Sequence, residues 1–284
     1  MTELSHPYLK RWLAISRTRI FVAVTVPCLI GSAIALRHGH FAFEPFALML
    51  FGLIMVESAN LLMADWATYR STSSLRVQLP PIIEGSPMIP EKLLPLRYSL
   101  DAAILCFALA GLTFAYFAAR VGFLVIILGA LALVIGAFYV LSPIRYGFFS
   151  TALLPPIIAF GSYYVLVGLT SWEPALATIP MMFLSSGVIF TYRILYSDEG
   201  SAQFRFRRRV LIGIYGFAYL GLAAAVLDGL TPVSLILGFA SLPILIAITR
   251  TLNFKTANYL PATSLGVLLY ATTGILIALS YALI

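Results

Sequence analysis

The residues best suited to do chemistry lie near the polar end of a long apolar run. Residues 44–67 are mostly hydrophobic, but Glu57 and Asn60 fall inside them, three residues apart. That spacing places both side chains on one face of a helix. An acid at membrane depth is costly, so it is expected to face a cavity and to have a function. The pair predicts contact with a substrate headgroup, although a hydrogen bond between two helices explains it equally well.

Basic residues gather at the ends of the apolar runs, where they could bind the phosphate groups of a lipid. They are Arg70, Arg76, Arg145, Arg193 and the RFRRR series at 205–209. The guanidinium fork matches two phosphate oxygens, so the first four are candidate substrate-binding residues. For RFRRR we favour a simpler interpretation, a positive cluster that fixes the orientation of the chain in a membrane.

Tyrosines could line a substrate pocket. Tyr163 and Tyr164 are the candidates, with Tyr139 and Tyr192 as weaker ones, because the ring faces of such residues stabilise a carbocation. The chain has 15 tyrosines. Packing, or a place in an aromatic belt at the membrane surface, is therefore the default explanation for any single one.

Composition places the chain in a membrane. It has 284 residues, 61% hydrophobic and 10% charged, whereas soluble domains carry about 25% charged residues. The formal charge of +7 is attributed to basic loops at an anionic membrane surface and not to a nucleic-acid site. Cys28 and Cys106 have no spacing typical of disulfides or metal sites, and His6, His38 and His40 are interpreted as loop residues.

Nine stretches are long enough to span a bilayer, which takes about 20 mostly apolar residues. They are residues 20–36, 44–67, 98–118, 121–142, 148–170, 174–196, 210–227, 231–249 and 259–283. Residues 1–19 lack the apolar core of a signal peptide and suit an interfacial helix or a solvated tail. The sequence therefore predicts an all-α integral membrane protein, with nine transmembrane helices in a single domain over residues 1–284.

The distribution of basic residues predicts the orientation. With the N-terminus inside, all of the 18 Lys and Arg residues except Arg37 and Arg120 lie on the inside. The two long loops, 70–97 and 197–209, fall on that side, so a site built from loops opens to the cytoplasm. These loops follow the second and sixth spans, which hints at two related halves.

Several stretches of the chain resemble the UbiA superfamily of intramembrane prenyltransferases, particularly its 1,4-dihydroxy-2-naphthoate polyprenyltransferase (menaquinone) branch. They are SRTRIFVAVTVPCLIGSAIA, ANLLMADWATYRS, PPIIEGSPMIP, SPIRYGFFSTALLPPIIAFGSYYVLVG and FTYRILYSDEGSAQFRF. Within them GSYYVLVG is the most specific point of likeness, and Arg145 stands where the family has a basic residue before a tyrosine. The resemblance implies nine helices around a central, lipid-accessible cavity, cytoplasmic functional loops and a bacterial inner membrane.

The resemblance also implies a metal site. In that family the second span ends in a pattern like N-x-x-N-D-x-x-D and the sixth carries D-x-x-x-D, and their carboxylates hold Mg²⁺ against the diphosphate of a polyprenyl donor. Carried over to this chain, the resemblance implies Asn60, Asp65 and Asp198 as catalytic residues. Asp198 and Glu199 are then the candidate magnesium ligands.

This sequence departs from both patterns. Aligned on Asn60, the family's remaining Asn and Asp positions in the first pattern hold Met63, Ala64 and Ala67, and Ile194 replaces the first aspartate of the second pattern. Asp65 lies one residue on, about 100° round a helix from the expected place. We favour an ion pair with Arg70 as the explanation for Asp65. For Asp198 and Glu199, the alternative to a metal site is a loop held by salt bridges.

Two functions remain open. One is a divergent prenyltransferase that joins an isoprenoid diphosphate to a quinone precursor or another lipophilic acceptor, or cyclises it. The other is a catalytically silent relative that binds a quinone, carotenoid or polyprenyl lipid, for instance as a subunit of a membrane complex. We favour the enzyme because chains of this kind are usually transferases. A secondary transporter is disfavoured, because paired ionisable residues in broken helices are lacking.

Overall fold

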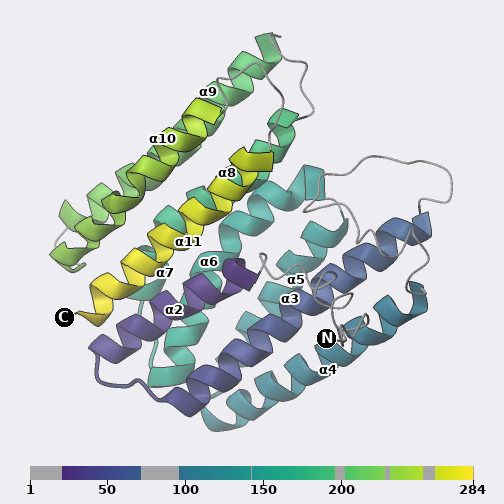
Figure 1. Cartoon of the computed structure of the whole chain (residues 1–284). Helices are drawn as coiled ribbons and strands as arrows, with labels where there is room; N and C mark the ends of the chain where they lie inside the picture. Colours follow the sequence, from purple (N-terminus) through teal and green to yellow (C-terminus); the bar gives the residue numbers. More distant parts are fainter. Residues whose placement is uncertain are drawn as a thin grey trace, which may run out of the picture.

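The structure, a computed structural model, describes residues 21–71, 96–141, 143–195, 202–227, 231–251 and 260–283. These residues contain helices and turns and no strand, which confirms the predicted all-α class (Figure 1). The helices are α2 (Val22–Arg37), α3 (Phe43–Ser71), α4 (Leu96–Arg120), α5 (Leu124–Leu141), α6 (Pro143–Val167), α7 (Glu173–Ala177), α8 (Ile179–Leu195), α9 (Ala202–Leu227), the 3-10 helix η2 (Val233–Ser241), α10 (Leu242–Thr251) and α11 (Leu260–Ala282).

Six stretches of the described chain are long and apolar enough to cross a membrane. They are Phe43–Ala64, Arg97–Arg120, Phe149–Val167, Phe204–Leu227, Val233–Thr251 and Ser264–Ala282. Helices of this length and composition are those of an integral membrane protein. The other three expected spans coincide with shorter apolar helices, Val22–Arg37, Leu124–Gly136 and Ile179–Thr191. The count of nine spans therefore stays a prediction.

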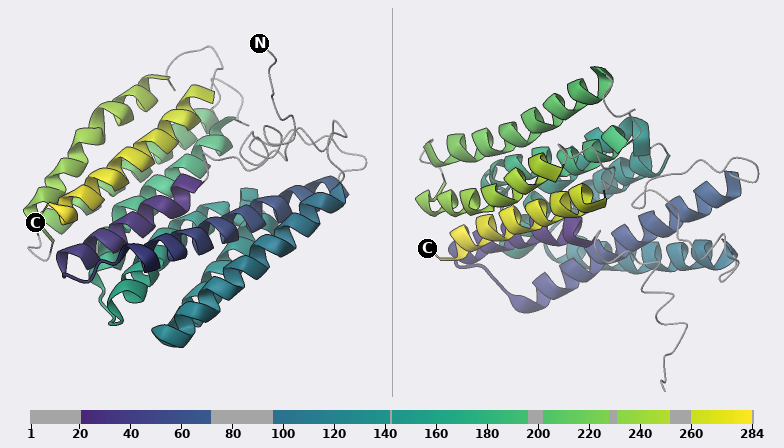
Figure 2. Two further views of the ribbon diagram at one scale, coloured as in Figure 1. Left: turned by 60° about the horizontal axis from the view of Figure 1, so that its bottom comes forward. Right: turned by 45° about the horizontal axis from the view of Figure 1, so that its top comes forward.

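Helices α2 and α6 lie in the middle of the bundle and join its two parts. Helices α3, α4 and α5 pack on one side of them, and α8, α9, η2, α10 and α11 on the other (Figures 1 and 2). Val24 and Cys28 of α2 belong to the apolar core on the α3 side, whereas Val26 and Ile30 belong to the core on the α11 side. Because α2 is buried on both faces, it is apolar all round rather than amphipathic.

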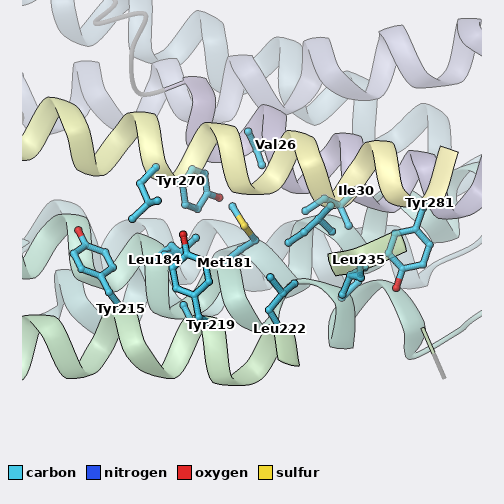
Figure 3. Packing of buried hydrophobic residues seen from close by; sticks show 14 of the residues in the cluster. Val26, Ile30, Met181, Leu184, Tyr215, Tyr219, Leu222, Leu235, Tyr270 and Tyr281 are labelled. Atoms are coloured by element: carbon cyan, nitrogen blue, oxygen red, sulfur yellow. The ribbon is translucent and has the colours of Figure 1, made fainter. Parts of the chain in front are cut away.

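The larger core lies between α11 and α9. Figure 3 shows its side chains directed toward one another from both helices and from α2, α8 and η2. Tyr215, Tyr281, Met181 and Leu184 are among its fully buried members. Large apolar and aromatic side chains at this depth fill the space between helices, where lipid cannot reach.

The described helices correct several predicted boundaries. The sixth predicted span, 174–196, is broken at Thr178 into α7 and α8. Pro180 removes one backbone donor just after the break, and the Thr178 hydroxyl bonds back to the carbonyls of Pro174 and Ala175, at 3.0 and 2.9 Å. The eighth predicted span is a 3-10 helix, η2, continued by α10.

The predicted loop 197–209 is also shorter than expected, because α9 already begins at Ala202. Residues 202–209 contain no Pro, Gly or β-branched residue that would oppose a helix. Similarly, the ends of the predicted loop 70–97 are helical, since α3 extends to Ser71 and α4 begins at Leu96. The N-terminal segment 1–19 and the remaining parts of both loops lie outside the described residues.

The hydroxyl of Ser241, at the end of η2, joins three helices inside the larger core. It donates to the Gly238 carbonyl at 2.7 Å, accepts from Thr273 of α11 at 2.8 Å, and lies 2.7 Å from the Tyr219 hydroxyl of α9. A serine hydroxyl has one donor and two acceptor sites, and here all three are used.

Replacing Ser241 by alanine is expected to lower the free energy of unfolding by about 2 kcal/mol, because two buried hydroxyls would lose their acceptor. The measurement is equilibrium unfolding of the full chain in mixed micelles. Thr249→Ala is the matched control, since the Thr249 hydroxyl makes only a local bond to Ile246 in the following α10. Equal losses in the two variants would contradict the role given to Ser241.

Candidate functional site

Glu57 and Asn60 lie one turn apart on α3 and are both partly accessible. The Asn60 amide lies against α5, because a carbon added to Gly136 would sit 2.6 Å from Asn60 Nδ2. Glu57 lies within electrostatic range of Tyr270 on α11, and the Tyr270 hydroxyl donates to the Ala23 carbonyl of α2 at 3.1 Å. The pair therefore faces α2, α5 and α11.

The opposite face of α3 packs on α4. Leu62 and Ala103 form a small apolar core between these two helices, and the Ser99 hydroxyl donates to the Leu62 carbonyl at 2.9 Å. Leu62 is two residues beyond Asn60, about 200° round the helix. The acid and the amide are thus directed away from α4 and toward the middle of the bundle.

Among the residues that the structure describes, neither polar side chain has a hydrogen bond or an ion pair. Asn60 contacts a glycine, which has no side chain to bond with, and Glu57 has only its electrostatic interaction with Tyr270. An acid and an amide in that position can accept hydrogen bonds from a bound group. This is the arrangement that a substrate headgroup would need, and that role remains a prediction.

Most of the other predicted site residues fall where side chains are not described. The backbones of Asp65 and Arg70 belong to α3, and those of Arg145 and Arg193 belong to α6 and α8, but the structure does not describe these four side chains. Arg76, Asp198 and Glu199 lie outside the described residues. The structure therefore tests neither the predicted metal pair nor most of the predicted phosphate-binding arginines.

Tyr163 and Tyr164 lie far from Glu57 along the helices. Tyr163 and Tyr164 are four and three residues from the end of α6, near the α2–α3 and α4–α5 connections. Glu57 is fourteen residues into α3, about 21 Å from the start of that helix. The Tyr163 hydroxyl is 2.8 Å from His38 Nδ1, and the Tyr164 hydroxyl donates to the Val121 carbonyl at 3.2 Å. The structure does not bring either tyrosine together with the Glu57–Asn60 pair.

A charged network that the sequence did not reveal surrounds Tyr163. Glu173, which begins α7, contacts the Arg37 guanidinium at 3.1 Å and His38 Nε2 at 3.3 Å. The same guanidinium lies 5.9 Å from the centre of the Tyr281 ring. These contacts tie the end of α2 to α6, α7 and α11. No sequence signal marks them, because Arg37 and Glu173 are 136 residues apart.

A small apolar pocket lies between α3, α4, α5 and α6. It has a volume of about 50 Å³, and its lining includes Leu53, Phe117, Val125 and Ile158. The hydroxyl of Ser162, also on the lining, is buried and has no hydrogen-bond partner among the described residues. The pocket is suited to a short stretch of hydrocarbon and is formed by different residues from the Glu57–Asn60 pair.

Two comparisons with known proteins gave no identification: neither a family model nor a curated protein sequence matched this chain. The geometry and the apolar helices define an all-α integral membrane protein with a polar pair inside its bundle. The resemblance to the UbiA superfamily stays a prediction.

Proposed function

We propose that the chain is a divergent UbiA-type intramembrane prenyltransferase, which moves the isoprenoid group of a polyprenyl diphosphate to a quinone precursor or another lipophilic acceptor. The observation that carries the proposal is the Glu57–Asn60 pair. It lies on the inner side of α3, partly accessible, and without a hydrogen bond to any described residue. A pair that served only to join two helices would have its partner on a neighbouring helix.

The charges suggest how two substrates would share the site. A carboxylate at Glu57 would repel a diphosphate and would accept a hydrogen bond from a neutral acceptor. The acceptor therefore belongs beside Glu57 and Asn60, and the diphosphate beside the arginines that the sequence places in the loops. In the transfer, the allylic C–O bond breaks, the acceptor forms the new bond to carbon, and its proton passes to Glu57.

Magnesium is the cofactor that the resemblance implies, and its candidate ligands Asp198 and Glu199 lie outside the described residues. Ile194 of α8 stands where that family has the first aspartate of its second pattern, and its side chain is fully buried in the larger core. Among the described residues there is no group of three or more His, Cys, Asp or Glu side chains arranged to hold a metal. In the proposed reaction, arginines near the loops stabilise the negative charge of the leaving diphosphate, together with any Mg²⁺ that Asp198 and Glu199 would hold.

The same isoleucine favours a second candidate function. A relative that kept the bundle and lost the first carboxylate of its second pattern would bind a quinone, a carotenoid or a polyprenyl lipid without reaction. Such a protein would fit a role as a subunit of a larger membrane complex. It would still use Glu57 and Asn60 to hold the headgroup of its ligand.

The proposal includes nine spans around a lipid-accessible cavity, a cytoplasmic N-terminus and a bacterial inner membrane. The orientation is supported by the basic residues, since all of the 18 except Arg37 and Arg120 fall on one side of the membrane in this topology. The functional loops would then open to the cytoplasm, where soluble diphosphates and polar quinone precursors are available.

The test is turnover by the purified full-length protein in lipid nanodiscs. Farnesyl diphosphate and 1,4-dihydroxy-2-naphthoate serve as probes, with Mg²⁺ and with a chelator. Glu57→Gln is expected to lower turnover about 100-fold or more, as the loss of a proton acceptor does. Glu44→Gln is the matched control, because Glu44 is exposed in the first turn of the same helix.

Asp65→Ala and Asp198→Ala complete the set, because they report on the acids that the resemblance singles out. Turnover that needs Mg²⁺ and is lost in Asp198→Ala would establish an enzyme with a reduced metal site. Binding of the naphthoate without turnover in the wild-type chain would instead support the silent relative. Full turnover in Glu57→Gln would contradict the role of the polar pair.

A further inference from the structure

The apolar pocket between α3, α4, α5 and α6 lies one helical turn from the Glu57–Asn60 pair. Leu53 lines the pocket, and Glu57 follows it four residues later on α3. Ala132 of α5 also lines it, and four residues later comes Gly136, against which the Asn60 amide lies. Residues four apart are neighbours on one face of a helix, about 6 Å apart along its axis. Two helices therefore lead from the pocket to the pair along the same faces.

The pocket is too small for a ring and large enough for a few carbons of a chain. Its volume is about 50 Å³, about one third of the roughly 150 Å³ of a cavity that holds benzene. Apart from two hydroxyl-bearing residues its lining is apolar, with Phe114, Phe117 and Ile158 among the larger side chains. Each methylene that enters such a lining strengthens binding about fourfold. A lipid whose headgroup lies at the polar pair would thus have its chain in the pocket.

One polar group of the lining has no partner. Ser162 has 2% of its surface exposed, and its hydroxyl makes no hydrogen bond to any described residue. The Cys28 thiol of α2 lies close to it, but a thiol is only a weak donor and acceptor, and no bond of normal geometry joins the two. Thr113, the other hydroxyl on the lining, already donates to the Leu109 carbonyl at 3.0 Å. A buried hydroxyl without a partner is costly, so a ligand that accepts from Ser162 is favoured.

We propose that this pocket holds the first part of an unsaturated, isoprenoid-type chain attached to the headgroup that Glu57 and Asn60 bind. The Ser162 hydroxyl would donate a weak hydrogen bond to the π face of a double bond, as N–H groups do to aromatic rings. A saturated chain offers no such acceptor. Because the pair must hold a headgroup, this placement of the chain rests on the proposed function. It applies equally to a transferase and to a silent lipid-binding relative.

The experiment measures binding of three probes to the full-length protein in lipid nanodiscs, without any diphosphate and without oxygen. The probes are 1,4-dihydroxy-2-naphthoate and the same ring carrying a 3-methylbut-2-enyl or a saturated 3-methylbutyl group beside its carboxylate. The wild-type protein is expected to bind the saturated derivative roughly 15-fold more tightly than the plain ring, as two buried methylenes would give. The unsaturated derivative should bind roughly threefold more tightly still, the effect of one weak hydrogen bond.

Two variants, each with a matched control, separate binding in the pocket from partition of the probes into the bilayer. Ala132→Leu enlarges a side chain of the lining and is expected to remove most of the gain from either chain, with the affinity for the plain ring unchanged. Ala130→Leu makes the same change at an exposed position of α5 outside the lining. Ser162→Ala should remove only the preference for the double bond. Ser32→Ala is its control, because the Ser32 hydroxyl is also buried without a hydrogen bond to any described residue but does not line the pocket.

Equal gains from the chain in the wild-type protein and in Ala132→Leu would overturn the placement of the chain. A preference for the double bond that survives in Ser162→Ala, or is lost equally in Ser32→Ala, would overturn the role of the hydroxyl. The headgroup site is tested separately by Glu57→Gln: an unchanged affinity for the plain ring would contradict the proposed function as well. A plain ring whose binding depends on Glu57 but gains nothing from either chain would overturn the pocket assignment alone.

Discussion

Replacing Gly31 by alanine is expected to lower the free energy of unfolding by about 3 kcal/mol, an overpacking cost at the upper end of the usual range. A Cβ at this position would clash with the Ala159 carbonyl oxygen of α6. That atom belongs to the backbone, so it cannot turn aside as the end of a side chain can. Because α2 and α6 both contribute to the two apolar cores, neither helix can move away without disturbing both cores.

The matched control for this prediction is Gly111→Ala in α4. No atom lies within 4 Å of a Cβ built at Gly111, and this glycine is exposed. Alanine should stabilise the helix there by roughly 0.5–1 kcal/mol, because it restricts the unfolded chain and favours helix. Equilibrium unfolding of both variants in mixed micelles is the measurement. A Gly31→Ala variant as stable as the control would contradict the close contact between α2 and α6.

The helices were predictable where apolar length alone determines them. The short α4–α5 connection was predicted before residue 121, but α4 extends to Arg120 and the connection contains Gly122. The φ of +135° at Gly122 suits a residue without a side chain. The break at Thr178 was missed, because prolines such as Pro180 are tolerated inside membrane helices and do not by themselves mark an end. The start of α9 was missed because its arginines make the first two turns too polar for a membrane span. Arginine nevertheless has a high helix propensity, so these turns are helical.

The candidate site was predictable only as far as local spacing reaches. Glu57 and Asn60 were assigned to one helix face from their separation, and they do face the middle of the bundle. The surface of α5 that Asn60 faces was not predictable, because its residue there is Gly136, which has no side chain that a sequence pattern could reveal. The contacts of Arg37 with Glu173 join residues 136 positions apart, and no short-range pattern encodes such a pair.

Replacing Gly136 by alanine is expected to weaken substrate binding and turnover about 100-fold, because a small misplacement of a binding group has effects of that size. The new Cβ would lie 2.6 Å from Asn60 Nδ2, so the amide must swing away from its present place. The stability should change little, since the atoms that must move are the end of a flexible side chain. The experiment measures affinity for 1,4-dihydroxy-2-naphthoate and the free energy of unfolding in the same preparation.

Gly129→Ala is the control, because Gly129 lies two turns earlier on the same helix and the atoms nearest to an added Cβ belong to the Phe114 ring, at an ordinary 3.4 Å or more. It should leave both affinity and stability close to those of the wild-type chain. An unchanged affinity in Gly136→Ala would show that Asn60 does not contact the substrate and that its amide has only a packing role. A loss of affinity at constant stability would place the ligand beside Asn60, whether or not the chain is an enzyme, since binding without turnover needs the same amide.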